Sequence, residues 1–113
     1  MMTLQQSWQF RVCYRSGRKV VCGHAVVFYH DNPDGDGLRV GVVASRKVGN
    51  AVKRNRAKRL LREASRTIAD KLNDTNLWVV LVARRPITEA GVTEVTSDIE
   101  QALATAGMLN QGT

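Results

Sequence analysis

Residues 46–62 read RKVGNAVKRNRAKRLLR, and they hold eight of the seventeen Lys and Arg residues of the chain and no acidic residue. If the segment from Asn50 is helical, polar side chains spaced three and four residues apart form one stripe along it. This basic stripe consists of Asn55, Lys58, Arg59, Arg62 and Arg66. Small and apolar side chains fall on the opposite side, where a core could cover them: Ala57, Leu60, Leu61, Ala64 and Ile68.

Unpaired cations along one helix face repel each other, so the basic stripe indicates a polyanionic partner, with nucleic acid as the leading candidate. An ordinary solvated helix face mixes charge signs and places Glu four residues before Lys or Arg. The one acid nearby, Glu63, instead follows Arg59. The alternative interpretation of such a run is a basic patch that resembles a nuclear-localisation signal or that binds acidic surfaces without specificity.

Length and charge favour one basic domain spanning residues 1–113, with an ordered core over about residues 8–107. The net charge is +7 and the sequence pI is about 10.1, which favours phosphate-rich partners. The charge is unevenly spread, because the first thirty residues contain four bases and no acid. Residues 86–113 contain four acids and no base, so we expect a basic working side and a neutral-to-acidic back.

The targeting and cysteine patterns predict a cytoplasmic protein without a metal. No apolar run approaches membrane-spanning length, and the N-terminal MMTLQQSWQF lacks the features of a secretory signal, so no membrane partner is expected. Cys13 and Cys22, taken with His24 and His30, match no zinc-ligand spacing. We interpret both cysteines as buried free thiols.

Periodicity and turn residues predict the element order α-β-β-β-α-β-α, a two-layer α+β domain. A short helix from Phe10 ends at Gly17, and strands follow at residues 19–22, 25–30 and 38–45. We expect the last two strands to form a hairpin around DNPDGDG at residues 31–37, which is a polar loop and not a calcium loop.

The second half of the chain continues this pattern. Gly49 permits a sharp turn and Asn50 an N-cap, so the basic helix should run from there to about Leu72 and end at Asn73. LWVVLVA at residues 77–83 is apolar enough for a central strand. A last helix over residues 88–106 should bury Val92, Val95, Ile99, Ala102 and Leu103.

The string from Lys47 to Glu63 resembles the signature of the bacterial ribonuclease P protein subunit, with KVGNAV, then Arg54-Asn55-Arg56, then KRLLRE at its core. LRVGVVASRK and LWVVLVARRP resemble the strands that flank that signature in the family, and residues 10–17 resemble its first helix. The resemblance therefore covers nearly the whole chain. One departure is the absence of basic residues in residues 1–9, where the family usually carries several.

This resemblance implies a fold and a function. The fold would be ribosomal-protein-S5-domain-2-like, with a left-handed β-α-β crossover that departs from the usual handedness rule. The protein would be an accessory subunit of a ribonucleoprotein that removes the 5′ leader from precursor tRNA. Its partners would be the ribonuclease P RNA subunit and precursor tRNA. The RNA would hold the required Mg²⁺ and perform the hydrolysis, and the protein alone would bind no cofactor.

The residues expected to bind RNA are those of the basic stripe and the polar residues next to it. Guanidinium groups bind phosphate oxygens through two parallel hydrogen bonds, and the helix N-terminus offers backbone N–H groups to an anion. The predicted set is Arg46, Lys47, Asn50, Lys53, Arg54, Asn55, Arg56, Lys58, Arg59, Arg62 and Arg66. A helical wheel places Arg54 at the margin of the apolar side, so a structural role is also open for it.

Apolar and aromatic residues near the first helix are candidates for a leader cleft, because aromatic faces stack on unpaired bases with little sequence preference. They are Phe10 and Tyr14, four apart on the helix, and Val27 and Tyr29, which share one face of a strand. Core packing is the alternative for each, and for Phe10 the two roles are equally open. Trp8 and Trp78 are interpreted as structural.

Two competing classes of function fit the residues less well. A metal-dependent nuclease needs clustered carboxylates, yet no acid lies between Gly37 and Arg62, so no catalytic residues are expected in the protein. DNA binding through a helix-turn-helix is disfavoured, because no second helix is joined to the basic helix by a tight turn. A basic RNA-binding or ribosome-associated module without a role in tRNA processing is the remaining alternative.

Overall fold

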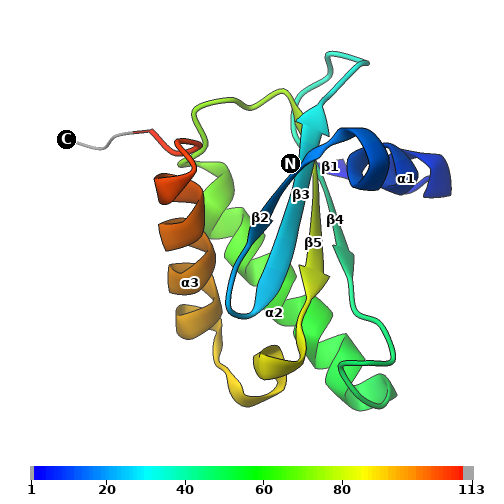
Figure 1. Ribbon diagram of the computed structural model, residues 1–113, viewed down its shortest axis with the longest axis vertical. Helices are drawn as coiled ribbons and strands as arrows, with labels where there is room; N and C mark the ends of the chain where they lie inside the picture. Colours follow the sequence, from blue (N-terminus) through cyan, green and yellow to red (C-terminus); the bar gives the residue numbers. More distant parts are fainter. Residues whose placement is uncertain (1, 111–113) are drawn as a thin grey trace.

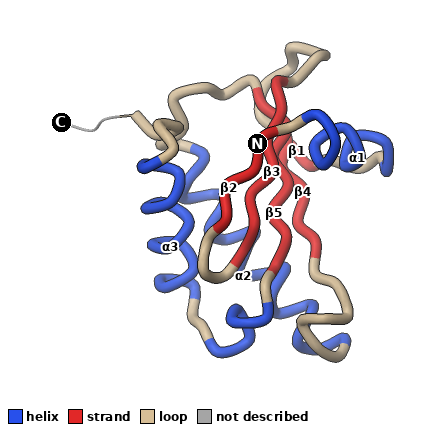
Figure 2. Tube along the Cα trace, viewed as in Figure 1, coloured by secondary structure: helices blue, strands red, loops and turns tan. Residues whose placement is uncertain are grey.

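The computed structural model describes residues 2–110 and contains a five-stranded sheet with the strand order β1-β4-β5-β3-β2. Figure 2 shows α2 and α3 gathered along one side of the strands and α1 lying apart from them. The elements are β1 (Met2–Thr3), α1 (Ser7–Ser16), β2 (Arg18–Val21), β3 (Ala25–Asp31), β4 (Arg39–Val43), α2 (Ala51–Ala69), β5 (Leu77–Ala83), the 3-10 helix η1 (Arg85–Glu89) and α3 (Val92–Thr105). The predicted α+β class and element order are confirmed, with β1 as an added edge strand.

The sheet carries a core on each face. Alternate residues of β5 point to opposite sides, so Val79 and Leu81 join the larger core under α2 and α3. Trp78 and Val80 join a smaller core under α1, together with Cys13. We call this second side the α1 face of the sheet. β5 is central, as predicted, because it pairs with β3 and with β4.

The predicted hairpin between residues 25–30 and 38–45 is wrong. β5 lies between β3 and β4, and β3 instead forms a hairpin with β2. The seven-residue loop DNPDGDG is long enough to pass over β5, because two strand spacings amount to only about 10 Å. Two apolar strands joined by a loop of turn-forming residues therefore need not be neighbours in the sheet.

The β4-α2-β5 unit has the left-handed sense that the resemblance implied. β4 and β5 are parallel neighbours. In Figure 1 the chain descends β4, returns upward through α2 behind the sheet and descends again along β5, to the left of β4. Nearly all such units have the opposite hand. With the strand order fixed, this hand places α2 on the face of the sheet opposite α1.

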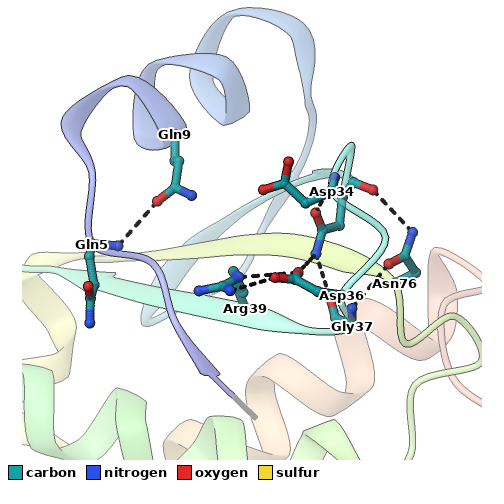
Figure 3. Close-up of polar contacts among 8 residues, drawn as sticks. Gln5, Gln9, Asp34, Asp36, Gly37, Arg39 and Asn76 are labelled. Atoms are coloured by element: carbon teal, nitrogen blue, oxygen red, sulfur yellow. Dashed lines mark hydrogen bonds and ion pairs between the residues drawn. The ribbon is translucent and has the colours of Figure 1, made fainter.

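The loop between β3 and β4 is ordered by polar contacts, which Figure 3 shows around Asp36 and Asn76. Asp36 pairs with Arg39 and accepts a hydrogen bond from Asn32 Nδ2 at 2.6 Å. Hydrogen bonds from Arg39 and then Asn32 lower the pKa of Asp36 to about 2. Gly37 N–H donates to Asn76 Oδ1 at 3.3 Å, which fastens the loop to the segment before β5.

Helix boundaries follow local chemistry and differ from several predictions. α1 begins at Ser7, before Phe10, where Gln9 Oε1 accepts hydrogen bonds from the backbone N–H groups of Gln5 and Gln6, the first of which is drawn in Figure 3. α2 begins after the predicted cap Asn50, whose Oδ1 accepts from Lys53 N–H at 3.0 Å. The preceding Gly49 has a φ of 145°, which favours glycine.

The predicted helix at residues 88–106 is divided in two. Pro86 lies in η1, and α3 begins only at Val92. Val95, Ile99 and Leu103 are buried as predicted, and Ala102 is partly buried, but Val92 is 37% exposed and was wrongly assigned to the core. Its position in the first turn of α3 leaves it at the edge of the packed surface. α2 also ends earlier than predicted, at Ala69.

Cys13 and Cys22 are free and buried, as predicted. Burial raises the pKa of each thiol to about 11, which keeps both protonated at neutral pH. Within residues 2–110, no helix is both long and apolar enough to cross a membrane.

Candidate nucleic-acid interface

The basic stripe lies on the outer side of α2, away from the core. Asn55, Arg59, Arg62 and Arg66 are exposed and Lys58 is partly buried, whereas Ala57, Leu60 and Leu61 are buried beneath them. Within residues 2–110, the ion pairs are formed by Arg39, Lys71 and His24, and none includes a residue of the stripe. The stripe is therefore a row of cations without acidic partners in that part of the chain.

The turn before α2 and the first turn of α2 add further bases beside the stripe. Arg46, Lys47 and Lys53 are exposed, and the Asn50 side chain is occupied in capping the helix. Arg85, the first residue of η1, donates from Nε to Lys47 O at 3.4 Å. Arg85 lies near Lys47 because β4 and β5 are parallel neighbours, so the segments that follow them leave the sheet at the same end.

Arg54 and Arg56 differ from the stripe because both make contacts within the protein. Arg54 Nη1 donates to Gly49 O at 3.0 Å, in line with the structural role left open for it. Arg56 donates from Nη2 to Ala90 O at 2.7 Å and from Nη1 to Thr88 O at 3.5 Å. Arg56 thus fastens η1 to α2, a role that the sequence did not indicate. The predicted contact between Arg56 and phosphate, through its other N–H groups, stays a prediction.

Replacing Arg56 with Ala is expected to destabilise the fold, because the carbonyl groups of Thr88 and Ala90 lose a charged donor. The loss should be roughly 1–3 kcal/mol in the free energy of unfolding. Urea denaturation followed by circular dichroism measures it, with Arg59→Ala as the control, since Arg59 is exposed and makes no such contact. Equal stability of the two variants would contradict the structural role of Arg56.

A second candidate surface lies on the α1 face of the sheet. Tyr14 is 41% exposed, and its ring meets that of Phe28 edge to face, with centroids 4.9 Å apart. Phe10, on the same side of α1, packs over β4, and Phe28 is partly buried beneath α1. These residues combine exposed ring surface with a rigid apolar floor, which suits the stacking of unpaired bases.

The assignment of Val27 and Tyr29 to this cleft is wrong. Val27 is fully buried in the larger core, on the side of α2 and α3. Tyr29 shares that side and lines a groove of about 410 Å³ at the end of the sheet, beside Arg18 and Asp31. Both faces of β3 are apolar, so its residue pattern does not indicate which face α1 covers. Phe28, of the opposite parity, is the residue that reasoning from sequence missed.

Gly41 is required for the position of Phe10. A Cβ atom at Gly41 would lie 2.5 Å from Phe10 Cζ, and Gly41 itself is buried in β4. The Phe10 ring therefore occupies the space that any other residue at position 41 would fill. This close contact ties α1 to the edge of the sheet.

We expect Gly41→Ala to destabilise the protein by roughly 1–3 kcal/mol, the usual cost of overpacking. Because the clash is with the Phe10 ring, Phe10→Ala should relieve it. The double variant Phe10→Ala/Gly41→Ala should therefore be more stable than the sum of the two single losses predicts. Urea denaturation of the four proteins in this cycle measures the coupling, and strictly additive losses would contradict it.

The tryptophans also lie on the α1 face of the sheet. Trp78 is fully buried, as its structural assignment predicted, and its Nε1 has no hydrogen-bond partner within the described residues. Trp8 is 47% exposed, and its ring meets that of Trp78 at an interplanar angle of 71° with centroids 5.5 Å apart. Trp8 thus contributes to the packing of α1 while leaving part of its ring at the surface.

Comparison with known proteins gives consistent matches over the whole fold. The sequence model of the Ribonuclease P family matches residues 1–107. The Ribonuclease P protein component of a Staphylococcus epidermidis strain is 32% identical over 108 residues, covering 96% of this chain and 92% of the relative. That of an Exiguobacterium species is 38% identical over 97 residues, covering 86% and 82%.

Solved structures agree with these sequence matches. The RNase P protein of Staphylococcus aureus matches with a TM-score of 0.83 and 26% identity, covering 97% of this chain and 99% of that one. The RNase P protein of Thermotoga maritima has a similar fold, with a TM-score of 0.78 at 24% identity over 93% and 97% of the two chains. The similarity extends over both candidate surfaces.

Proposed function

The chain belongs to the ribonuclease P protein family, and from this premise we propose that the basic stripe binds the RNA subunit and the α1 face holds the leader. Membership makes the chain the accessory protein subunit of the endoribonuclease that matures the 5′ end of tRNA. It also implies association with ribonuclease P RNA and with a tRNA substrate. We place this activity in the cytoplasm, where precursor tRNA would meet it.

The observation that carries the proposal is the row of unpaired cations on a rigid helix. The side chains of Arg59, Arg62 and Arg66 project from α2 without acidic partners within residues 2–110. Folded RNA presents dense negative charge, and neutralising it releases bound counterions, which drives association. Asn55 adds an amide that can bond a phosphate, a 2′-hydroxyl group or a base edge.

The α1 face supports a separate role in substrate binding. Tyr14 and Phe28 offer aromatic surface on one side of the sheet, whereas α2 packs on the opposite side. A leader of variable sequence needs contacts that tolerate any base, and stacking provides them. The two surfaces can therefore bind two different RNA molecules at once.

We assign the hydrolysis to the RNA subunit and its divalent ions. Residues 2–110 contain no group of three or more His, Cys, Asp or Glu side chains that could hold a metal ion. The side chains near the basic stripe thus do not fit a protein-bound metal centre, and the protein's part is to bind and orient RNA. By offsetting repulsion between phosphates, its cations should lower the Mg²⁺ concentration that the holoenzyme needs.

A binding ratio tests the leader assignment. Tyr14→Ala and Phe28→Ala should each weaken binding of precursor tRNA to the holoenzyme at least about five-fold, because one stacked base contributes on the order of 1–3 kcal/mol. Mature tRNA has no leader, so its affinity should not change. Filter binding at fixed salt gives the ratio of precursor to mature affinity.

Tyr29→Ala is the matched control, because Tyr29 lies on the opposite side of the sheet from α1. Its ratio of affinities should equal that of the wild type. Circular dichroism checks that each variant is folded. If Tyr14→Ala and Phe28→Ala also leave the ratio unchanged, the leader does not contact the α1 face and this part of the proposal fails.

A further inference from the structure

A groove joins the two surfaces at the free edge of β4. β1 pairs only with Arg39 and Val40, and the last backbone contact along this edge is Leu4 N–H to Val40 O at 3.1 Å. By the alternation of a strand, the backbone polar groups of Val42 also point to this edge, beyond the end of β1. The groove has a volume of about 290 Å³ and lies between β4, α1 and α2. We call it the edge groove.

One wall of the edge groove is cationic and the other is apolar. Arg62 and Arg66, one turn apart on α2, form the first wall, and no acidic residue lines the groove. Leu4, Phe10 and Gly41 contribute to the second, where the absence of a side chain at Gly41 lets the Phe10 ring lie against the strand. A phosphate fits the first wall and a nucleobase fits the second.

The size of the groove agrees with this chemistry. Its volume of about 290 Å³ is close to the lower limit of small-ligand pockets, roughly 300 Å³. The backbone groups of Val42 add a donor and an acceptor that could bond the edge of a base. A single nucleotide therefore matches the groove in charge, in apolar surface and in volume.

We propose that the edge groove receives one unpaired nucleotide of the RNA subunit when the basic stripe docks. This inference rests on the proposed function, since Arg62 and Arg66 belong to the stripe. Continuity with the stripe favours the RNA subunit over the leader as the source of the nucleotide. Of the three aromatic residues of the leader surface, Phe10 lines the groove, whereas Tyr14 and Phe28 do not.

Blocking the groove without changing its charge tests the proposal. Thr3 is exposed on the rim, and Trp is well suited to a strand, so Thr3→Trp should fill the groove and keep the fold. Binding of the RNA subunit alone should weaken at least about five-fold, the loss expected for one stacked base. The slope of log affinity against log salt should fall by no more than one phosphate contact, roughly 0.7–0.9, because only the nucleotide in the groove loses its contact with Arg62 and Arg66.

Chemical probing of the RNA subunit gives a second measurement. A base-modifying reagent should reach one or a few nucleotides in the Thr3→Trp complex that the wild-type protein protects. The control is Thr93→Trp, the same change at an exposed position of α3. Arg66→Glu should expose the same nucleotides. This variant provides the test if Thr3→Trp does not fold. Arg59→Glu, with the same charge change outside the groove, should not expose them.

The outcomes separate this inference from the function on which it rests. If Thr3→Trp and Thr93→Trp give the same affinity and the same protection, or if Arg66→Glu exposes no more than Arg59→Glu, the groove holds no nucleotide of the RNA subunit. If Thr3→Trp changes only the ratio of precursor to mature tRNA binding, the leader occupies the groove and the inference is overturned. Failure of the wild-type protein to bind the RNA subunit would instead overturn the proposed function.

Discussion

Cleavage of precursor tRNA is expected to vanish when the RNA subunit is omitted and to return when RNA and Mg²⁺ are added. Hydrolysis of a phosphodiester needs an activated water and charge stabilisation at the leaving oxygen, which metal ions commonly supply. The stripe offers only cations and an amide. His24 Nδ1 is hydrogen-bonded to Asp98 Oδ2, and His30 Nδ1 is hydrogen-bonded to Asp31 O. Both histidines therefore have partners away from the stripe. Gel assays with each component omitted in turn measure the effect.

The same assay distinguishes an accessory protein from a catalytic one. RNA without protein should retain cleavage only at raised Mg²⁺ or raised ionic strength, because its phosphates then need salt to offset their repulsion. Adding the protein should shift the Mg²⁺ dependence to lower concentration. Specific cleavage by protein that has been freed of RNA would contradict the assignment of catalysis to the RNA.

The sequence was sufficient to predict α2 and its orientation. Its polar and apolar residues repeat with one helical period, so the side facing the core and the side facing solvent follow from spacing alone. Asn50 could be placed at the start because an Asn side chain accepts hydrogen bonds from the free N–H groups of the first turn. The central position of β5 followed from its continuous apolar run.

The leader surface could not be placed in the same way, because a strand with apolar residues on both faces does not indicate which helix covers which face. Phe28 and Val27 are adjacent and equally apolar, yet they belong to opposite cores. The contacts of Arg56 were equally hidden, since they reach carbonyl groups more than thirty residues away. β1 is only two residues long and carries no periodic signal.

The basic stripe carries the second large effect that we expect. Replacing Lys58, Arg59 and Arg62 together with Gln should lower affinity for the RNA subunit at least about a hundred-fold, because each lost charge-assisted hydrogen bond contributes roughly 1.5–3 kcal/mol. Each lost phosphate contact should also reduce the slope of log affinity against log salt by roughly 0.7–0.9. Titrations of labelled RNA subunit over a range of salt concentrations measure both quantities.

A variant with the same net charge separates the stripe from the overall basicity of the chain. Arg11, Arg15 and Arg18 are exposed and lie outside α2, so replacing all three with Gln removes as much charge from another surface. If the net charge of +7 alone attracted RNA, both triple variants would lose affinity equally. Localised binding instead predicts a large loss only for the α2 variant. The α2 variant should remain folded, because removing like charges from an exposed helix face relieves repulsion. A loss of affinity that is seen only together with unfolding would show that the stripe is structural.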